Sequence, residues 1–182
     1  DDIKTFRPDI AILTNITEDH LDRYDYRFEN YIKSKFSIVQ HQVPDDFFIY
    51  NEDDPVIAEN LKRYPFQSNP LPFTMKQEPD QGGFISNGQM ILKTGKETLQ
   101  MSIYDFALKG IHNQYNTLAA GLAAVTIGIR KEKIREAVQS FSALEHRMEY
   151  VSTVRGVEFI NDSKATNVNS TWYALESMQK PV

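Results

Sequence analysis

Short apolar runs alternate with an amphipathic helical pattern at the start of this chain, and that alternation limits the folds it can adopt. Residues 10–15 and 47–50 are nearly continuous apolar runs, which are typical of strands buried on both faces of a parallel sheet. Between them, residues 27–40 place five apolar side chains on one helical face, namely Phe28, Tyr31, Ile32, Phe36 and Val39. Strands that alternate with helices predict an α/β protein with a largely parallel sheet flanked by helices.

The middle of the chain has a different pattern. Residues 65–103 contain four prolines, which break helices, and an Asn87-Gly88 pair that favours a tight hairpin turn. We expect a small antiparallel β-rich section, with strands in residues 84–86, 89–92 and 98–103. Earlier, Pro55 suits the first turn of a helix that follows the polar turn at residues 51–54.

Regular patterns return after residue 110. Helices are predicted over residues 113–127 and 131–141, and Gly128 suits the end of the first. Residues 148–154 and 157–160 predict two strands joined at Arg155-Gly156, and residues 171–179 predict a helix capped by Asn169 or Ser170.

The composition excludes several classes of function. The chain has no cysteine, so it forms no disulfide, no zinc–thiolate site and no thiol nucleophile. The net charge is -5 and no long basic run occurs, which argues against a nucleic-acid partner. No apolar run is long enough for a membrane span, and Asp1-Asp2 does not suit a signal peptide. We therefore expect a cytoplasmic protein, and we expect it to be monomeric.

Two polar clusters follow predicted strands, where ligands bind in parallel α/β sheets. The first spans residues 14–24 and combines oxygen side chains with the imidazole of His20, a set that suits magnesium. The alternative is a helix start in which Thr17 and Asp19 cap free N–H groups. The second cluster spans residues 160–167, where Lys164 suits an anion and Asp162 suits ribose hydroxyls; the alternative is an ordinary polar loop.

Lys35 has the most informative position of any single residue. On a helical wheel it lies within the apolar face of residues 27–40, whereas Lys33 points away. A lysine in such a place needs a partner or an altered charge, and a neutral amine can react with carbon dioxide. The alternative is that the ammonium of Lys35 reaches water from the edge of the apolar face.

Three further residues are candidates for contacts with a nucleotide. Asn113 and Asn116 lie one helical turn apart and could read a base edge, although Asn113 could instead be a helix cap. Arg147 lies between two predicted units and could bind phosphate, or could be an ordinary surface arginine.

Taken in order, these motifs resemble those of the Mur ligases. Thr14-Asn15, Asp19-His20-Leu21-Asp22 and the pair Tyr31 and Lys35 resemble the central-domain motif of that family. Gly110, His112, Asn113 and Asn116 resemble its nucleotide-contacting helix, and His146-Arg147 resembles the junction to its C-terminal domain. Residues 161–167 (NDSKATN) resemble the branch of the family that adds D-glutamate.

The resemblance implies a domain division and a reaction. Residues 1–141 would be the later part of the ATP-binding central domain, and residues 142–182 the start of a Rossmann-like C-terminal domain. ATP would bind between the two and phosphorylate the carboxylate of UDP-N-acetylmuramoyl-L-alanine. The amine of D-glutamate would then attack the acyl phosphate, in a step of peptidoglycan synthesis.

The resemblance also implies a role for each candidate residue. His20 would bind magnesium, and Lys35 would be carbamylated and help to hold that ion; with Lys164, these are the expected catalytic residues. Asn113 and Asn116 would contact the adenine end of ATP, Arg147 its phosphates and Asp162 its ribose. Lys164 and Thr166 would lie near D-glutamate.

Departures from the family pattern limit what this stretch of sequence can do alone. It has no G-x-x-x-x-G-K-[ST] phosphate loop, which in the family lies upstream of Asp1. We therefore expect the chain to be an inactive fragment of an active enzyme. The alternatives are another ligase of the superfamily, such as a folylpolyglutamate synthetase, and a non-catalytic nucleotide-binding module.

Overall fold

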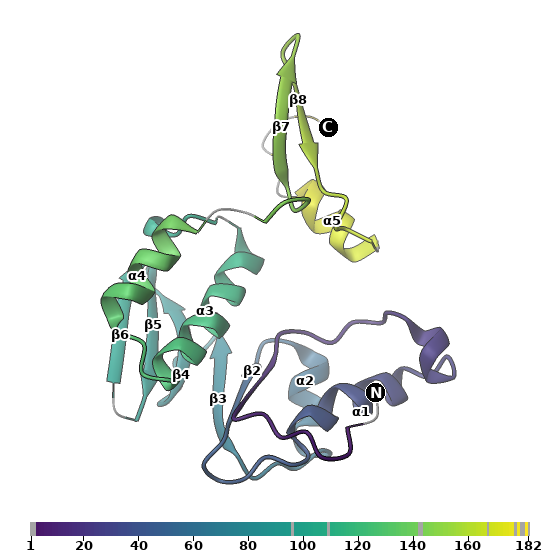
Figure 1. The fold of residues 1–182 in the computed structure, drawn as a ribbon, viewed down its shortest axis with the longest axis vertical. Helices are drawn as coiled ribbons and strands as arrows, with labels where there is room; N and C mark the ends of the chain where they lie inside the picture. Colours follow the sequence, from purple (N-terminus) through teal and green to yellow (C-terminus); the bar gives the residue numbers. More distant parts are fainter. Residues whose placement is uncertain are drawn as a thin grey trace. The chain divides into compact units, whose positions relative to one another are not determined.

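A computed structural model of the chain describes residues 3–95, 97–108, 110–141, 144–166, 168–176, 178 and 181. The chain forms two compact units, residues 1–139 and residues 140–182 (Figure 1). None of the described helices is long and apolar enough to cross a membrane.

A six-stranded sheet forms the centre of the first unit, and its strands follow one another in chain order (Figure 1). They are β1 (Ile10–Leu13), β2 (Phe47–Asn51), β3 (Asn69–Thr74), β4 (Gly82–Ser86), β5 (Gln89–Thr94) and β6 (Glu97–Ser102). The pairs from β1 to β4 are parallel and those from β4 to β6 are antiparallel. The predicted α/β fold is confirmed, and the hairpin at Asn87 and Gly88 belongs to this same sheet.

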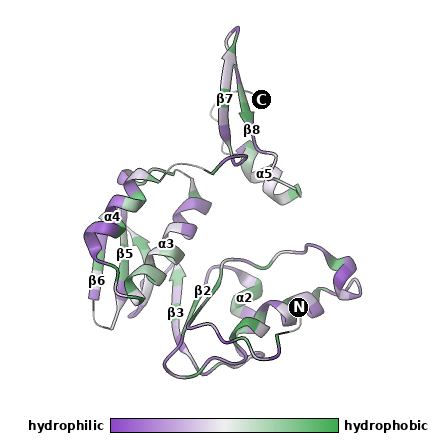
Figure 2. Ribbon diagram, in the orientation of Figure 1, coloured by the Kyte–Doolittle hydropathy of each residue, from purple (hydrophilic) through white to green (hydrophobic). Residues whose placement is uncertain are grey.

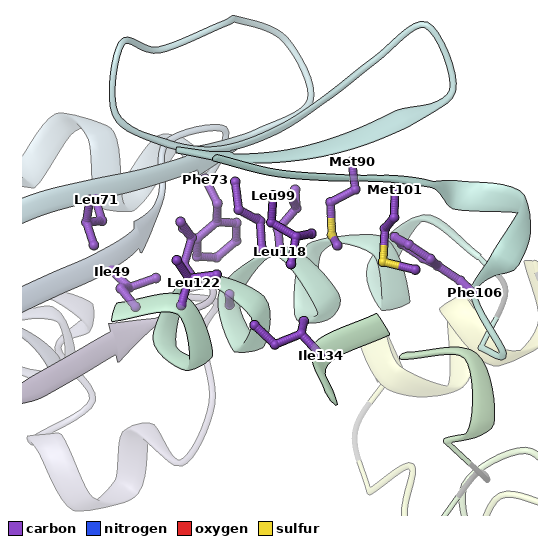
Figure 3. Packing of buried hydrophobic residues seen from close by; sticks show 13 residues of the cluster. Ile49, Leu71, Phe73, Met90, Leu99, Met101, Phe106, Leu118, Leu122 and Ile134 are labelled. Carbon is purple, nitrogen blue, oxygen red and sulfur yellow. The ribbon is translucent and has the colours of Figure 1, made fainter. Parts of the chain in front are cut away.

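Helices cover both faces of the sheet, so β2 is buried on both sides as its apolar run predicts. Phe48 and Tyr50 pack in one cluster with α1 (Phe28–Phe36) and α2 (Pro55–Asn60). Ile49 belongs to the other cluster, with α3 (Ile111–Thr126) and α4 (Lys131–Ser140). Figure 3 shows that second cluster, in which α3 and α4 supply Leu118, Leu122 and Ile134.

The described residues of the first unit also form three short 3-10 helices: η1 (Leu21–Tyr24), η2 (Ser37–Val39) and η3 (Ile103–Asp105). The helix predicted over residues 27–40 is therefore α1 followed directly by η2. η1 lies within the first polar cluster, where the alternative interpretation was a helix start capped by Thr17 and Asp19; its N-cap is His20, which makes no side-chain cap bond.

β3 is the strand that the sequence patterns missed. It contains Pro70 and Pro72, and proline is rare inside sheets because it has no N–H to donate. The N–H of Asn69 donates to Asp46 O, just before β2, at 2.9 Å, and Phe73 O accepts from the N–H of Glu52, just after β2, at 3.0 Å. The backbone groups of the alternate residues therefore face β4. Pairing with β4 begins only at Phe73, and the two prolines therefore leave no gap in that ladder. The section that we expected to be antiparallel thus begins with a parallel strand.

Gly82 stands where β4 begins beside β3. Its φ is 128°, a value that residues with a side chain rarely adopt. A Cβ atom at this position would lie 2.2 Å from the carbonyl oxygen of Pro72. The close approach of the two backbones therefore requires glycine here.

Glycines also stand at both ends of α3. Gly110 is its N-cap, with φ 97°, and Gly128 follows its end with φ 78°. The N–H of Gly128 donates to Val125 O at 3.0 Å, and that of Ile129 donates to Ala124 O at 2.9 Å. These two bonds form a Schellman motif, so the predicted stop at Gly128 is confirmed.

The described part of the second unit is a hairpin and a helix. β7 (Glu149–Val154) and β8 (Val157–Asn161) pair antiparallel, with the predicted turn at Arg155 and Gly156. α5 (Val168–Glu176) begins earlier than expected, so Asn169 and Ser170 lie within it and do not cap it. Large apolar side chains are exposed along the hairpin, and Figure 2 shows the apolar character of β8. The Rossmann-like continuation of this unit stays a prediction.

Candidate functional site

The carboxyl ends of β1 and β2 meet at one edge of the sheet. The side-chain amide of Asn51, at the end of β2, donates to the carbonyl oxygen of Thr14 at 3.0 Å. The N–H of Ile16 donates to Asp54 Oδ2 at 3.2 Å. Hydrogen bonds from the second strand end therefore hold the loop that carries the first polar cluster.

A cavity of about 450 Å³ opens beside this loop. β1 and the residues after it contribute Thr14 and Asn15, and α1 contributes Tyr31, Ser34 and Lys35. Its other lining residues are Ile3, Ile12, Leu13, Tyr24, Ser37 and Ile38. The structure thus brings Lys35 to one cavity with Thr14, Asn15 and Tyr24 of the first polar cluster, whereas His20 of that cluster does not line it.

Lys35 is half-buried, whereas Lys33 on the same helix is exposed. Its Nζ lies 4.8 Å from the centroid of the Tyr31 ring, a cation–π contact. Tyr31 in turn packs edge-on against Tyr24, with ring centroids 5.1 Å apart. The amine of Lys35 thus stands at the cavity in contact with the Tyr31 ring, and its carbamylation stays a prediction.

His20 lies on the loop after β1, in the left-handed region with φ 50°. Its side chain is 69% exposed, and its Nε2 lies 3.7 Å from Asp19 Oδ2. Asp19 Oδ1 accepts a bond from the N–H of His20 at 3.0 Å and caps no α-helix, since α1 starts only at Phe28. Among the described residues, no three His, Asp or Glu side chains gather as a metal site. His20 is not among the residues that line the cavity beside Lys35, and the magnesium-binding role of both residues stays a prediction.

The residues after β2 have a larger part in the site than their sequence suggested. Asp53 Oδ1 accepts from the hydroxyl of Thr74 at 2.7 Å. Asp53 Oδ2 accepts from the N–H of Met75 at 2.7 Å and from the hydroxyl of Tyr115 at 2.8 Å. Burial raises the pKa of Tyr115, and the hydrogen bond and negative charge of Asp53 raise it further. Sequence reasoning treated residues 51–54 as a polar turn, although their place at a strand end was the available signal.

Asn113 and Asn116 stand in the first turns of α3, on either side of Tyr115. Because Gly110 is the N-cap, the explanation of Asn113 as a cap is wrong. Asn113 is half-buried and Asn116 is exposed. The two amides are therefore on a helix that Asp53 ties to the sheet edge.

In the second unit, the segment around Arg147 meets the second polar cluster. The N–H of Met148 donates to Asp162 Oδ1 at 3.1 Å, and the N–H of Lys164 donates to His146 O at 3.1 Å. Asn161 Nδ2 lies 2.8 Å from His146 Nδ1. Two motifs that the sequence separates by 14 residues, counted from Met148 to Asp162, thus form one hydrogen-bonded group.

The candidate side chains of this group differ in exposure. Arg147, Lys164 and Thr166 are exposed, whereas Asp162 is half-buried. Thr166 also borders a groove of about 490 Å³, lined further by Ala165, Val168, Thr171, Trp172 and Leu175. Asn167, the last residue of the predicted motif, lies outside the described residues.

A Mur ligase middle-domain family model matches residues 1–124, and the chain belongs to the Mur ligase family. Among curated relatives, the UDP-N-acetylmuramoylalanine–D-glutamate ligase of Christiangramia forsetii is 48% identical over 179 residues. That match covers 98% of this chain and 40% of the relative, so the chain spans about two fifths of the length of the ligase it matches.

Solved structures share the fold. MurF from Acinetobacter baumannii superposes with a TM-score of 0.72 at 20% identity, covering 93% of this chain and 37% of that one. MurF ligase from Thermotoga maritima, in complex with ADP, superposes with a TM-score of 0.64 at 20% identity, covering 93% and 39%. At these identities the likeness concerns the fold alone.

Proposed function

We propose that the protein containing this chain is an ATP-dependent ligase that joins D-glutamate to UDP-N-acetylmuramoyl-L-alanine in peptidoglycan synthesis. The observation that carries the proposal is the 48% identity to a D-glutamate ligase over 98% of the chain. It is supported by a cavity that combines Lys35 with the polar end of β1. A cytoplasmic location and a monomeric state belong to the same proposal.

The reaction has two steps. The substrate carboxylate attacks the γ-phosphorus of ATP, so that ADP leaves and an acyl phosphate forms. The amine of D-glutamate then attacks the acyl carbon, phosphate leaves, and the amine loses a proton as the amide bond forms. Because little covalent chemistry falls to the protein in phosphoryl transfer, its side chains act by placing the reactants and stabilising their charge.

In the first unit, Lys35 and His20 would serve the phosphoryl group. A half-buried lysine at a polar cavity suits carbamylation, which turns a cationic amine into an anionic oxygen ligand. His20 would add a nitrogen ligand, and the other ligands of a magnesium ion would come from outside the described residues. When bound, magnesium would offset charge on the transferring phosphoryl group.

The nucleotide and the amino acid would each meet a separate set of residues. Asn113 and Asn116 of α3 would contact the adenine end of ATP, and the ADP-bound relative of the same fold supports nucleotide binding. Arg147 would contact the phosphates and Asp162 the ribose. Exposed Lys164 and Thr166 would meet D-glutamate, whose two carboxylates suit a lysine ammonium.

The test is phosphate release by the full-length protein with ATP, magnesium and UDP-N-acetylmuramoyl-L-alanine. D-glutamate is compared with L-alanine, L-lysine, meso-diaminopimelate and L-glutamate as matched amino acids. We expect release that depends on D-glutamate alone. Release with another amino acid would place the protein in a different branch of the family, and no release with any of them would point to a non-catalytic nucleotide-binding module.

A further inference from the structure

Three side chains at and just after the end of β2, those of Asn51, Asp53 and Asp54, form hydrogen bonds to two different segments of the site. Asn51 is only 8% exposed. None of the three is among the described residues that line the cavity beside Lys35. Because these three side chains do not line the cavity, they can influence the reaction only through the backbone and side-chain groups to which they are hydrogen-bonded.

The first segment that they hold is the loop after β1. Asn51 Nδ2 donates to Thr14 O at 3.0 Å, and Asp54 Oδ2 accepts from Ile16 N–H at 3.2 Å. Asp54 also caps α2, since its Oδ1 accepts from Ile57 N–H at 2.9 Å. The backbone on both sides of Asn15, which lines the cavity, is therefore fixed to the end of β2.

The second segment is the start of α3, which is far away in the sequence. Asp53 Oδ2 accepts a hydrogen bond of 2.8 Å from the hydroxyl of Tyr115, which lies 62 residues later in the sequence. The same carboxylate is anchored by Thr74 and Met75 at the end of β3, with 2.7 Å for each bond. Asp53 thus ties the helix that carries Asn113 and Asn116 to the ends of two strands. A hydrogen bond from Asp53 N–H to Asn51 Oδ1, of 3.0 Å, joins the two sets of contacts.

We propose that Asn51, Asp53 and Asp54 are positioning residues, which hold the Thr14–Ile16 loop and the first turns of α3 at fixed places on one sheet edge. The inference rests on the proposed function, in which the loop serves phosphoryl transfer and α3 serves the nucleotide. The two links then have different kinetic signatures. Loss of the Tyr115 bond weakens ATP binding, whereas loss of the Thr14 bond displaces the loop and slows the chemical step.

The experiment uses the full-length ligase and measures KM for each substrate separately, together with kcat. Tyr115→Phe removes a single hydroxyl, and we expect the KM for ATP to rise about tenfold with little change in kcat. The KM values for D-glutamate and the sugar nucleotide should stay unchanged. Tyr104→Phe makes the same change on a tyrosine that is 79% exposed and serves as the matched control.

Two more variants separate positioning from general stability. Asn51→Asp keeps the shape and the Oδ1 acceptor but loses the donor to Thr14, so we expect kcat to fall while the KM for ATP changes little. Asp53→Asn combined with Tyr115→Phe should raise the KM for ATP little beyond Asp53→Asn alone, because that variant already replaces the Oδ2 acceptor of the Tyr115 hydroxyl. Additive effects, or an unchanged KM for ATP in Tyr115→Phe, would overturn the proposal.

Amide hydrogen exchange provides a readout that does not depend on catalysis. In Tyr115→Phe, exchange in the first turns of α3 should speed up, while α4 should exchange as in the wild type. If the wild type shows no D-glutamate-dependent phosphate release but α3 exchanges faster in the variant, the proposed function fails and the positioning link stands. If α3 exchanges at the wild-type rate, the positioning link fails whatever the activity.

Discussion

The carboxylate of Asp162 accepts a hydrogen bond from the backbone N–H of Met148 at 3.1 Å. The residue proposed to meet the ribose of ATP therefore also holds the segment that carries Arg147, proposed to meet the phosphates. Met148 has a φ of 49° and His146 a φ of 66°, so Arg147 stands between two residues in the left-handed region. Such a backbone persists only where its surroundings fix it, and Asp162 supplies one of those contacts.

Substitutions at Asp162 should separate these two roles. Asp162→Ala loses both the ribose contact and the Met148 bond, and we expect the KM for ATP to rise at least about tenfold. Asp162→Asn keeps an acceptor for Met148, so its KM should rise less. ATP titrations of the full-length ligase measure both values, with Glu158→Gln on the exposed hairpin as a control. Equal effects of the alanine and asparagine variants would argue against the Met148 contact.

Lys35 should be required for the reaction, whereas Lys33 should not. Both lie on α1, but only Lys35 borders the cavity. Loss of a charged group that acts on the transferring phosphoryl group lowers kcat on the order of a hundredfold. We therefore expect the kcat of Lys35→Ala to be lower than that of the wild type by at least that factor. Lys33→Ala should keep the wild-type rate, and added bicarbonate should not restore Lys35→Ala. Phosphate release measures all three, and a wild-type rate in Lys35→Ala would remove the role.

Gly82→Ala should destabilise the first unit strongly. The new Cβ would lie 2.2 Å from Pro72 O at a φ of 128°, so the paired backbones of β3 and β4 must separate. We expect a loss of roughly 3 kcal/mol or more in the free energy of unfolding. Gly128→Ala is the matched control, because its φ is also positive but nothing lies within 4 Å of the new atom; about 1–2 kcal/mol is expected. Urea unfolding of both variants checks this, and equal losses would contradict it.

The contribution of Tyr115 to stability should decline at high pH. Burial first, and then Asp53, raise the pKa of Tyr115 above its usual 10.0, so the folded state favours the protonated phenol. That contribution is fully present below pH 10.0 and is lost as the pH rises through the folded pKa. The wild type should exceed Tyr115→Phe in unfolding free energy at about pH 9, and the difference should narrow by about pH 11. A difference that does not change between these pH values would contradict the assignment.

The sequence predicted best where one local pattern decides the structure. The apolar runs of β1 and β2 and the Asn87-Gly88 turn each have a direct physical cause, and all three are confirmed. β3 was missed because Pro70 and Pro72 disfavour a strand, and only the register with β4 shows why they are tolerated. Register is a tertiary property that no local pattern contains.

In the candidate site, too, the residues indicated by a local pattern were predicted, and those that depend on tertiary contacts were not. Lys35 was identifiable because it interrupts an apolar helix face, and the structure places it at a cavity. The bond from Tyr115 to Asp53 joins residues 62 apart, so neither residue signals the other in the sequence. The predicted helix began two residues later than α3, which starts at Ile111, since Asn113 suits a cap equally well on sequence grounds.

In the six-stranded sheet, the strands from β2 to β6 each pair with the strand before them in the chain, and this order affects how the first unit can fold during synthesis. From β2 to β6, each strand can therefore pair with the preceding strand as soon as it is made, because no later strand lies between the two. During synthesis, the sheet can therefore grow one strand at a time as the chain emerges, through contacts that are short in sequence. α3 is made after all six strands, and its docking seals an apolar face that is exposed until then. Between the completion of β6 and the docking of α3, that apolar face is open to aggregation.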